Sequence, residues 1–284
     1  MTSKEIIAFL EKGIKANRAD SFRKGNIIRL PSTGRVIMTG DLHGNIKNFE
    51  KICRFARLER NSHCHLILHE LLHCSEFQDS SDQCHSYRLV AQAAELKARL
   101  PDQVHILLGN HEMAQITGGE ILKSGQPMVR SLKAGLVAAF GENSDLVINI
   151  LNEFILSLPI AARSENRIWL SHSLPSSGHL ADFDESIFVK RLSLHDMKDN
   201  ASLHALAWDR RHSRSCLEKL SEMWDADIFI VGHQPQADGC KRAHPQLIIL
   251  ASDHAHGCCL PFDLDKNYQP EQLFDLIKPL ASIQ

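Results

Sequence analysis

The chain has 284 residues, of which 43% are hydrophobic and 23% are charged, and this balance predicts a folded globular protein with a sizeable core. Lysine and arginine together number 32, and aspartate and glutamate number 34, which leaves a net charge of −2. No bulk positive field therefore recruits nucleic acid or an anionic membrane, and we expect neither a nucleic-acid polymer nor a membrane as a partner.

The N-terminal stretch predicts an amphipathic helix over about residues 3–17. Thr2 and Glu5 fit a capping box, and Ile6, Leu10 and Ile14 lie on one helical face. The stretch lacks the charged-then-apolar order of a secretory signal, and no run of about 18 apolar residues occurs in the chain. We therefore expect a cytoplasmic protein, and we expect its eight scattered cysteines to be free thiols.

Several apolar runs then predict β-strands, and each is followed by side chains suited to metal binding or acid–base chemistry. The runs are GRVIMTGD (34–41), HLIL (65–68), VHILLGNHE (104–112), RIWLSHSLP (167–175), DIFIVGHQP (227–235) and LIILASDHAHG (247–257). Helical patterns precede two of them, at about 87–100 and 214–225. Repeated polar residues at strand ends indicate a site built at one edge of a sheet.

The region from about residue 113 to 162 has a mostly helical pattern with strong apolar faces. No internal repeat, low-complexity tract or Pro/Gly/Ser linker divides the chain. We therefore expect one domain over residues 1–284, with a helical insert at about 113–162.

Two short motifs carry most of the chemical information. Asp41 and His43 alternate in a turn between two glycines, so that an oxygen and a nitrogen ligand can approach one cation. Asn110 and His111 follow a buried strand in the string Gly-Asn-His-Glu (109–112). Either motif alone occurs often by chance, whereas the two in this order are far more specific.

With these motifs in place, the sequence resembles the calcineurin-like metallophosphoesterases, in particular the branch that contains bacterial-type Ser/Thr phosphatases and diadenosine tetraphosphatases. The family signature is GDxHG, GDxxDRG, GNHE and two later strand-end histidines. This chain has GDLHG (40–44), GNHE (109–112), SHSLP around His172 and VGHQP around His233. The resemblance covers roughly residues 35–257 and implies an α/β fold of two mixed β-sheets packed as a sandwich and flanked by helices.

The second family motif is altered in this chain. Glu70 falls at the place of the metal-bridging Asp, His73 at the second Asp and Cys74 at the phosphate-binding Arg. A carboxylate is retained, but the bidentate guanidinium that would hold two phosphate oxygens is missing. Another residue must supply that function.

The resemblance implies a site for two divalent metal ions, for which mixed oxygen and nitrogen ligands suit Mn, Fe or Zn. One ion would be held by Asp41, His43 and Glu70. The other would be held by the shared carboxylate together with Asn110, His172 and His233. Two such ions would activate a bridging water for attack on a phosphomonoester, without a covalent enzyme intermediate.

The resemblance also assigns His111 as the general acid that protonates the leaving oxygen. Its orienting partner stays open between His73, Asp79 and Asp82. For the phosphate clamp, the segment ALAWDRRHSR (205–214) offers Arg210 first and Arg211 second. His254 and His256 lie where the family carries its last active-site loop, so either could line the pocket.

The expected substrate is a phosphorylated protein, a nucleotide or a small phosphate ester, and a diadenosine-polyphosphate hydrolase is the close alternative. A zinc protease is a rival hypothesis, because His69, Glu70 and His73 satisfy the motif H-E-x-x-H. That motif requires a helix, whereas the residues before it predict a strand. A noncatalytic metal-binding domain is a third hypothesis, motivated by the altered second motif.

Overall fold

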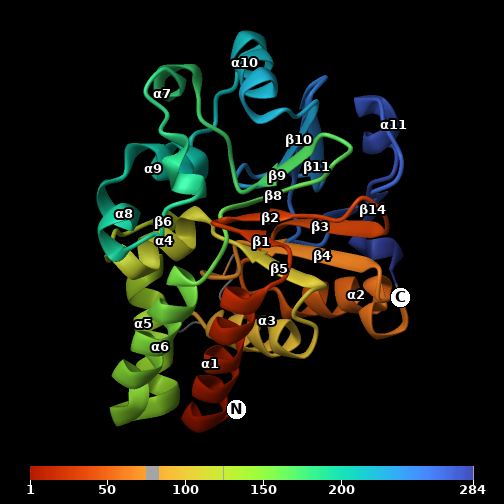
Figure 1. Ribbon diagram of the computed structural model, residues 1–284. Helices are drawn as coiled ribbons and strands as arrows, with labels where there is room; N and C mark the ends of the chain where they lie inside the picture. The colour runs from red at the N-terminus through yellow and green to blue at the C-terminus, as the bar shows by residue number, and fades with distance from the viewer. Residues whose placement is uncertain (75–82, 124, 284) are drawn as a thin grey trace.

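The structure, a computed structural model, describes residues 1–74, 83–123 and 125–283. Two β-sheets lie face to face, and helices cover their outer faces (Figure 1). One sheet has the strand order β14-β13-β3-β4-β5, and the other has the order β1-β2-β8-β9-β10-β12-β11. Both mix parallel and antiparallel neighbours, which confirms the predicted α/β sandwich.

The first sheet contains β3 (Arg35–Asp41), β4 (Cys64–His69), β5 (Val104–Leu107), β13 (Cys258–Asp263) and β14 (Lys278–Pro279). The second contains β1 (Arg23–Lys24), β2 (Ile27–Arg29), β8 (Ala161–Arg163), β9 (Ile168–Ser171), β10 (Ile228–Val231), β11 (Cys240–His244) and β12 (Leu247–Leu250). A separate hairpin pairs β6 (Leu122–Lys123) with β7 (Gln126–Pro127).

The helices are α1 (Ser3–Ala19), α2 (Ile46–Ala56), α3 (Tyr87–Arg99), α4 (Asn110–Thr117), α5 (Met128–Phe140), α6 (Ser144–Leu156), α7 (Ser177–Leu180), α8 (Leu194–Asp199), α9 (Ala201–Trp208), α10 (Arg214–Trp224) and α11 (Pro270–Phe274). Single 3₁₀ turns occur at Leu58–Arg60, Gly141–Asn143, Glu185–Phe188 and Leu280–Ser282. No helix of the described residues is long and apolar enough to cross a bilayer.

Successive side chains of a strand point to opposite faces of its sheet, so each strand contributes to both core layers. On β3, Val36 and Met38 point between the sheets, where they join Leu170 of β9 and Ile230 of β10. The side chain of Ile37, between them, instead joins the layer under the helices. Each sheet is therefore apolar on both faces, which explains why its strands read as near-continuous hydrophobic runs.

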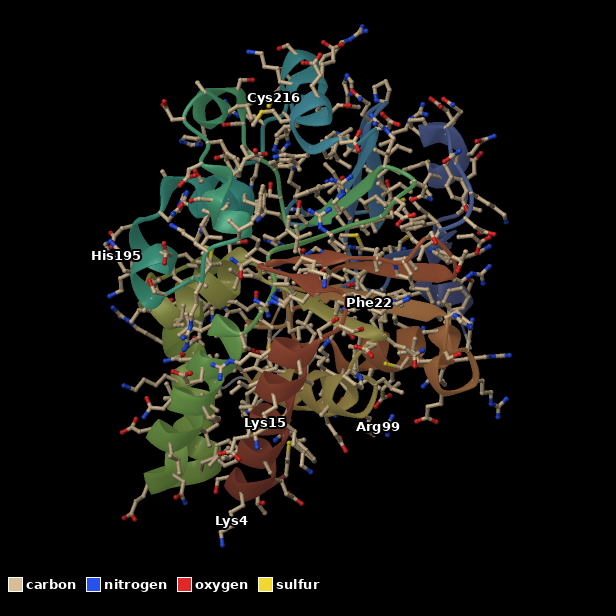
Figure 2. All side chains as sticks on the ribbon, viewed as in Figure 1. Lys4, Lys15, Phe22, Arg99, His195 and Cys216 are labelled. Carbon is tan, nitrogen blue, oxygen red and sulfur yellow. The ribbon has the colours of Figure 1, made fainter. Side chains whose placement is uncertain are left out.

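The first helix follows from its sequence as expected. Thr2 and Glu5 form the capping box, and the buried face of α1 packs mainly on α3 and α6. Lys4 and Lys15 are exposed and point away from the body of the molecule (Figure 2). The helix runs two residues beyond the predicted end at 17.

The expected helical run at 113–162 is only partly helical. It contains most of α4 and all of α5 and α6, but the β6–β7 hairpin interrupts it and its last two residues belong to β8. Strands of two residues are too short to show an alternating pattern, so the hairpin left no signal of its own. That the chain forms one domain stays a prediction.

The parallel pairing of the central strands determines where the site lies. β3, β4 and β5 run parallel in one sheet, and β9, β10 and β12 run parallel in the other, so the carboxyl ends of each trio lie at one edge. An isolated parallel bridge between Asp41 and Ala251 joins the end of β3 to the end of β12. The two edges therefore meet.

Candidate metal centre

The side chains predicted for the site converge where these strand ends meet. Most of them line a cavity of about 490 Å³ together with residues of the β6–β7 hairpin, and the buried His172 lies beside this lining, against Asn110 and His233. The expectation of a single sheet edge is wrong, because β3, β4 and β5 contribute from one sheet and β9 and β10 from the other. Sequence alternation cannot distinguish strands of one sheet from strands of two. The lining includes Asp41, His43, Glu70, Asn110, His111, Lys123, Arg210, His233, Asp253 and His254.

The altered second motif forms a tight, non-helical turn after β4. Glu70 and His73 both have positive φ, 51° and 62°, a backbone conformation that costs on the order of 1–3 kcal/mol each for such residues. Glu112 holds this turn, because its Oε1 accepts hydrogen bonds from the backbone N–H groups of Leu71 (2.9 Å) and Leu72 (3.0 Å). The zinc protease hypothesis is therefore wrong, since H-E-x-x-H needs both histidines on one helix.

Three histidines have one ring nitrogen occupied by a partner outside the cavity. His43 donates through Nδ1 to the carbonyl oxygen of Leu72 (3.0 Å). Nε2 of His233 lies 2.9 Å from the carbonyl oxygen of Trp208, to which it can donate, and 2.9 Å from Nε of Arg210, from which it can accept. His172 is oriented by His69, whose Nε2 donates to the carbonyl oxygen of Thr39. The bonds of His43 and His69 leave Nε2 of His43 and Nε2 of His172 unprotonated, which is how protein metal ligands are usually oriented.

The orientation of His172 involves a chain of two imidazoles. Because His69 carries its proton on Nε2, its Nδ1 accepts from Nδ1 of His172 at 3.1 Å. Nε2 of His172 is then unprotonated and faces Oδ1 of Asn110 and Oε2 of Glu70. In the sequence, the only motif that includes His69 is H-E-x-x-H. Its contact with His172 joins residues that are 103 positions apart, so no local pattern indicates it.

Bare donor atoms crowd together at the centre of the site. Oδ1 of Asn110 lies 2.8 Å from Nε2 of His172 and 2.8 Å from Nδ1 of His233, and those two nitrogens are 3.1 Å apart. Oε2 of Glu70 lies 3.1 Å from the same His172 nitrogen. Two donors about 2.1 Å from one ion and at right angles would be about 3.0 Å apart, so the spacing fits a shared cation.

Two buried triads of metal-competent side chains result from these contacts. His43, Glu70 and His111 offer ligand atoms within 4.8 Å of one another, and Asp41, His69 and His172 do the same. The first triad keeps the predicted pairing of His43 with Glu70. Asp41 falls in the other triad, although it lines the same cavity.

Burial makes the ionised form of Asp41 and Glu70 unfavourable, and a bound cation would offset this cost. Desolvation raises the pKa of Asp41 to about 7 and raises that of Glu70 well above its ordinary value. Oε2 of Glu70 accepts no hydrogen bond from the described residues. The other oxygen, Oε1, accepts a single bond within the described chain, from the backbone N–H of His111 at 3.3 Å. A buried carboxylate with so few donors is costly unless it meets a positive charge, so the residues fit a metal centre.

His111 is oriented by the altered motif. Its Nδ1 lies 2.8 Å from Nδ1 of His73, and Nε2 of His73 donates to Oε1 of Gln115 (3.1 Å). His73 thus occupies the place of the family's orienting carboxylate but carries no negative charge. The other candidates, Asp79 and Asp82, lie outside the described residues.

Burial and the neighbouring histidines lower the pKa of His111. Its Nε2 faces Oε1 of Glu70 at 3.5 Å.

The two neighbouring arginines have different surroundings. Arg210 lines the cavity, with Nε 2.9 Å from Nε2 of His233. Arg211 is exposed and lines a separate surface hollow beside α7. Of the two late histidines, His254 lines the cavity, whereas His256 is exposed and is not part of the described lining.

Lys123 was not expected at the site. It reaches the cavity from the β6–β7 hairpin, and its Nζ lies 3.7 Å from Oδ2 of Asp253. No motif surrounds it in the sequence. The hairpin places it across the cavity mouth from the strand ends, where a second cation faces the metal ligands.

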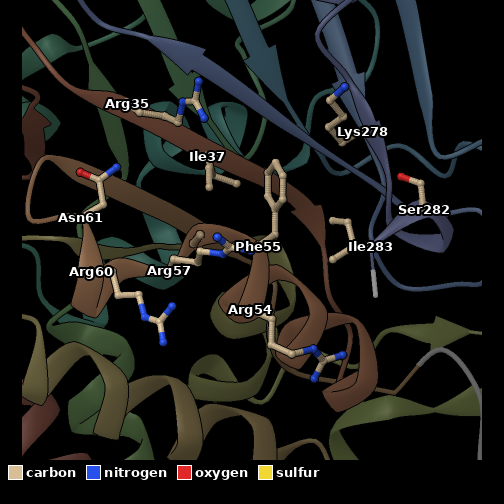
Figure 3. Close-up of a pocket in the computed structure, with 11 residues that line it drawn as sticks. Arg35, Ile37, Arg54, Phe55, Arg57, Arg60, Asn61, Lys278, Ser282 and Ile283 are labelled. Carbon is tan, nitrogen blue, oxygen red and sulfur yellow. The ribbon is translucent and has the colours of Figure 1, made fainter.

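A second hollow at the other end of β3 has different chemistry. Its lining combines basic and apolar side chains, and it holds no carboxylate or imidazole among its described residues (Figure 3). The labelled side chains include Arg35, Arg54, Arg57, Arg60 and Lys278. A hollow lined by five cationic side chains and lacking carboxylate and imidazole in its described lining disfavours the expected metals, so the carboxyl ends of the strands are the better candidate for the metal centre.

Comparison with known proteins identifies the fold. A search of curated protein sequences finds no match. Among solved structures, a serine/threonine phosphatase from Saccharomyces cerevisiae with similarity to human phosphatase PP5 has a TM-score of 0.71 at 14% identity, covering 99% of this chain and 94% of its own. A cold-active protein-tyrosine phosphatase of Shewanella sp. has a TM-score of 0.56 at 12% identity, covering 86% and 78%. At these identities the likeness shows the fold alone.

The sequence itself matches the calcineurin-like phosphoesterase family over residues 34–269, a span that includes every residue of the two metal-competent triads. The chain therefore belongs to the calcineurin-like phosphoesterases and is a metal-dependent phosphoric ester hydrolase.

Proposed function

We propose that this chain is a phosphatase that hydrolyses phosphomonoesters with two divalent metal ions, and that phosphoserine and phosphothreonine in proteins are among its substrates. The observation that carries the proposal is the convergence of bare donors: Asn110 Oδ1, His172 Nε2 and His233 Nδ1 lie within 2.8–3.1 Å of one another. Three lone pairs at this spacing repel each other unless a proton or a cation lies between them, and one cation can satisfy all three at once.

In this proposal Asp41, His43 and Glu70 hold one ion, and Glu70, Asn110, His172 and His233 hold the other. When bound, two such ions lower the pKa of water toward neutrality and offset the charge that develops on the phosphoryl group. The mixture of carboxylate, amide and imidazole ligands suits Mn, Fe or Zn.

Arg210 and Lys123 bind the phosphoryl oxygens in place of the arginine that the second motif lacks. Both line the cavity that holds the metal ligands. A guanidinium presents a fork to two oxygens, whereas an ammonium acts as a point charge, so Arg210 orients the phosphate and Lys123 mainly attracts it. Asp253 pairs with Lys123 at 3.7 Å and would release it to the substrate.

His111 carries the proton for the leaving oxygen. Its Nδ1 donates to Nδ1 of His73 at 2.8 Å, so Nε2, the nitrogen directed toward Glu70, must take up a proton before it can pass one to the leaving oxygen. His73 is a positioning residue in this scheme, because it contacts His111 and not the cavity. Glu112 is also a positioning residue, because its hydrogen bonds to Leu71 and Leu72 hold the turn that carries Glu70.

The test measures metal and turnover separately. The protein is loaded with Mn²⁺, desalted and analysed for bound metal, and is then assayed with p-nitrophenyl phosphate, phosphoserine and phosphothreonine peptides and diadenosine tetraphosphate. We expect two ions per chain and turnover of the monoesters. Glu70→Ala should lose bound metal and activity, whereas Glu142→Ala, which removes an exposed carboxylate, should keep both.

Each alternative outcome identifies a different error. Full metal occupancy in Glu70→Ala would remove this residue from the centre. Hydrolysis of the dinucleotide without the monoesters would assign the nucleotide hydrolase instead. Two bound ions with no turnover of any ester would favour a noncatalytic metal-binding domain.

A further inference from the structure

Two cysteines beside the site have their sulfurs in unusual proximity. Sγ of Cys74 lies 3.0 Å from Sγ of Cys84, although the residues are ten positions apart. The backbone N–H of Cys74 also donates to the Cys84 sulfur at 3.1 Å. A disulfide has an S–S length of about 2.05 Å, so a movement of roughly 1 Å would join these sulfurs.

The pair is accessible from one side only. Cys74 is partly exposed, whereas Cys84 is completely buried. A small oxidant can therefore reach Cys74, and the buried Cys84 is held next to it as the thiol that completes the bond. The other six cysteines are free as well. Among the described residues, the Cys74–Cys84 contact is the one at which two sulfurs lie as close as 3.0 Å.

The pair is joined to the proposed acid through a short series of contacts. Cys84 donates to Oγ of Ser86 (3.2 Å), and the same Oγ accepts from the backbone N–H of His73 (2.9 Å). His73 then contacts His111. Cys74 directly follows His73, whose backbone has a positive φ of 62° and so depends on its surroundings to keep that conformation.

Cys74 also abuts the first metal-binding turn. A Cβ placed on Gly44 would lie 3.2 Å from the Cys74 sulfur and 3.0 Å from Cβ of Ser86, so both side chains pack against the residue that follows His43. Displacement of Cys74 therefore affects the turn that carries His43 as well as the one that carries His73.

We propose that Cys74 and Cys84 are a reversible oxidation site, at which a low-molecular-weight disulfide such as glutathione disulfide forms a Cys74–Cys84 bond and slows the phosphatase. The effect on activity rests on the proposed function, whereas formation of the bond does not.

The reaction balances through two thiol–disulfide exchanges. The Cys74 thiolate attacks glutathione disulfide, and one glutathione leaves with the proton from Cys74. The Cys84 sulfur then attacks the mixed disulfide, and the second glutathione leaves with the second proton. Two protein thiols are oxidised by two electrons, and one glutathione disulfide is reduced to two glutathiones.

The bond should displace the acid through His73, and it should also disturb the turn that carries His43. Oxidation removes both S–H groups, so Ser86 loses the hydrogen bond from Cys84. Cys84 lies three residues before α3, which anchors it, and Cys74 must supply most of the movement, carrying His73 with it. Misplacement of a catalytic group by about 1 Å can cost about 100-fold in rate, so we expect kcat to fall about tenfold or more.

The bond is tested by mass, without reference to activity. The metal-loaded protein is incubated with glutathione disulfide, its remaining thiols are alkylated, and it is digested with a protease that cleaves after glutamate. This protease cuts at Glu76, between the two cysteines, so the linked peptides remain together only if the disulfide has formed. We expect a linked pair that dithiothreitol separates. A glutathione adduct on Cys74 without a linked pair would overturn the proposal, as would unmodified thiols.

The effect on the site is tested by comparing each variant with itself. Wild type should lose activity with glutathione disulfide and regain it with dithiothreitol, while Cys74→Ser and Cys84→Ser should each keep the activity they have without oxidant. Cys240→Ser is the matched control, because Cys240 is also partly exposed and has its own cysteine neighbour, Cys258. It should respond as wild type does.

The remaining outcomes separate the bond from its effect. A linked pair with unchanged kcat would overturn the regulatory part of the proposal. An equal oxidant response in Cys74→Ser would assign the effect to another site. If neither the reduced nor the oxidised protein hydrolysed any phosphomonoester, the proposed function would fail while the mass measurement still decided whether the bond forms. Thermal unfolding of both serine variants checks that they are folded.

Discussion

Substitution of Gly109 by alanine tests the metal centre through a single added carbon. A Cβ at this position would lie 2.0 Å from Oε2 of Glu70 and 2.7 Å from Oε2 of Glu112. Ordinary van der Waals contact begins at 3.4 Å, so the Glu70 carboxylate must move by about 1.4 Å. The backbone of Gly109 has φ −110° and ψ 173°, which any residue adopts, so alanine adds no backbone strain.

The displaced oxygen is the one that faces His172 at 3.1 Å. Glu70 is 1% exposed but lines the cavity, so the cavity is the space into which its displaced carboxylate turns, away from its contact with His172. A misplacement of this size should lower kcat/KM by about 100-fold, whereas overpacking should cost about 1–3 kcal/mol of the free energy of unfolding. Activity is therefore expected to fall much further than stability.

The assay combines p-nitrophenyl phosphate turnover, elemental analysis of bound Mn²⁺ and urea unfolding. Gly178→Ala is the matched control, because a Cβ there meets no atom within 4 Å, and it should match wild type in all three measurements. A Gly109→Ala protein with two bound ions and full activity would refute the placement of Glu70 in the centre. Loss of cooperative unfolding would show instead that the fold cannot absorb the methyl group.

Three further tests address other parts of the molecule. Arg210→Ala should lower kcat/KM by about 10- to 100-fold while Arg211→Ala leaves it unchanged, and equal effects would show that the cavity does not distinguish them. Lys123→Met should raise KM more than it lowers kcat, measured with p-nitrophenyl phosphate, and an unchanged KM would exclude its contact with phosphate. Burial, aided by His105, lowers the pKa of buried His65 to about 4, so its contribution to stability is present above pH 6.5 and is lost as pH falls toward 4. Between pH 7 and 5 wild type should lose about 2 kcal/mol more than His65→Leu by urea unfolding, and parallel losses would contradict this.

Local sequence pattern was sufficient to predict the strands and most of the side chains that converge at the site. Each parallel strand is a short apolar run whose last residues must turn sharply, so the polar residues that follow it fall at the same edge. Asp41, Asn110, His172 and His233 were found in this way, and the structure brings all four to one centre. Their distances along the chain did not matter, because the sheet order determines which ends meet.

The features that the sequence did not reveal depend on side-chain direction or on short segments. Arg210 and Arg211 are neighbours in a loop without periodicity, so nothing local indicates which one enters the cavity. Lys123 lies on a two-residue strand that leaves no pattern. The role of His69 as a support for His172 requires a contact between β4 of one sheet and the end of β9 of the other. All three depend on tertiary packing.

The backbone conformation of Glu70 explains why a glutamate fits at the second motif. Glu70 has a φ of 51°, and its carboxylate reaches His172 across the space left by the missing Cβ of Gly109. A shorter aspartate on the same backbone would end about one carbon–carbon bond earlier, farther from the donors that converge on Asn110. The longer side chain, the strained turn and the glycine are therefore one arrangement. Glu112, which holds the turn through Leu71 and Leu72, lies on the same helix as Asn110 and so fixes the carboxylate relative to its fellow ligand.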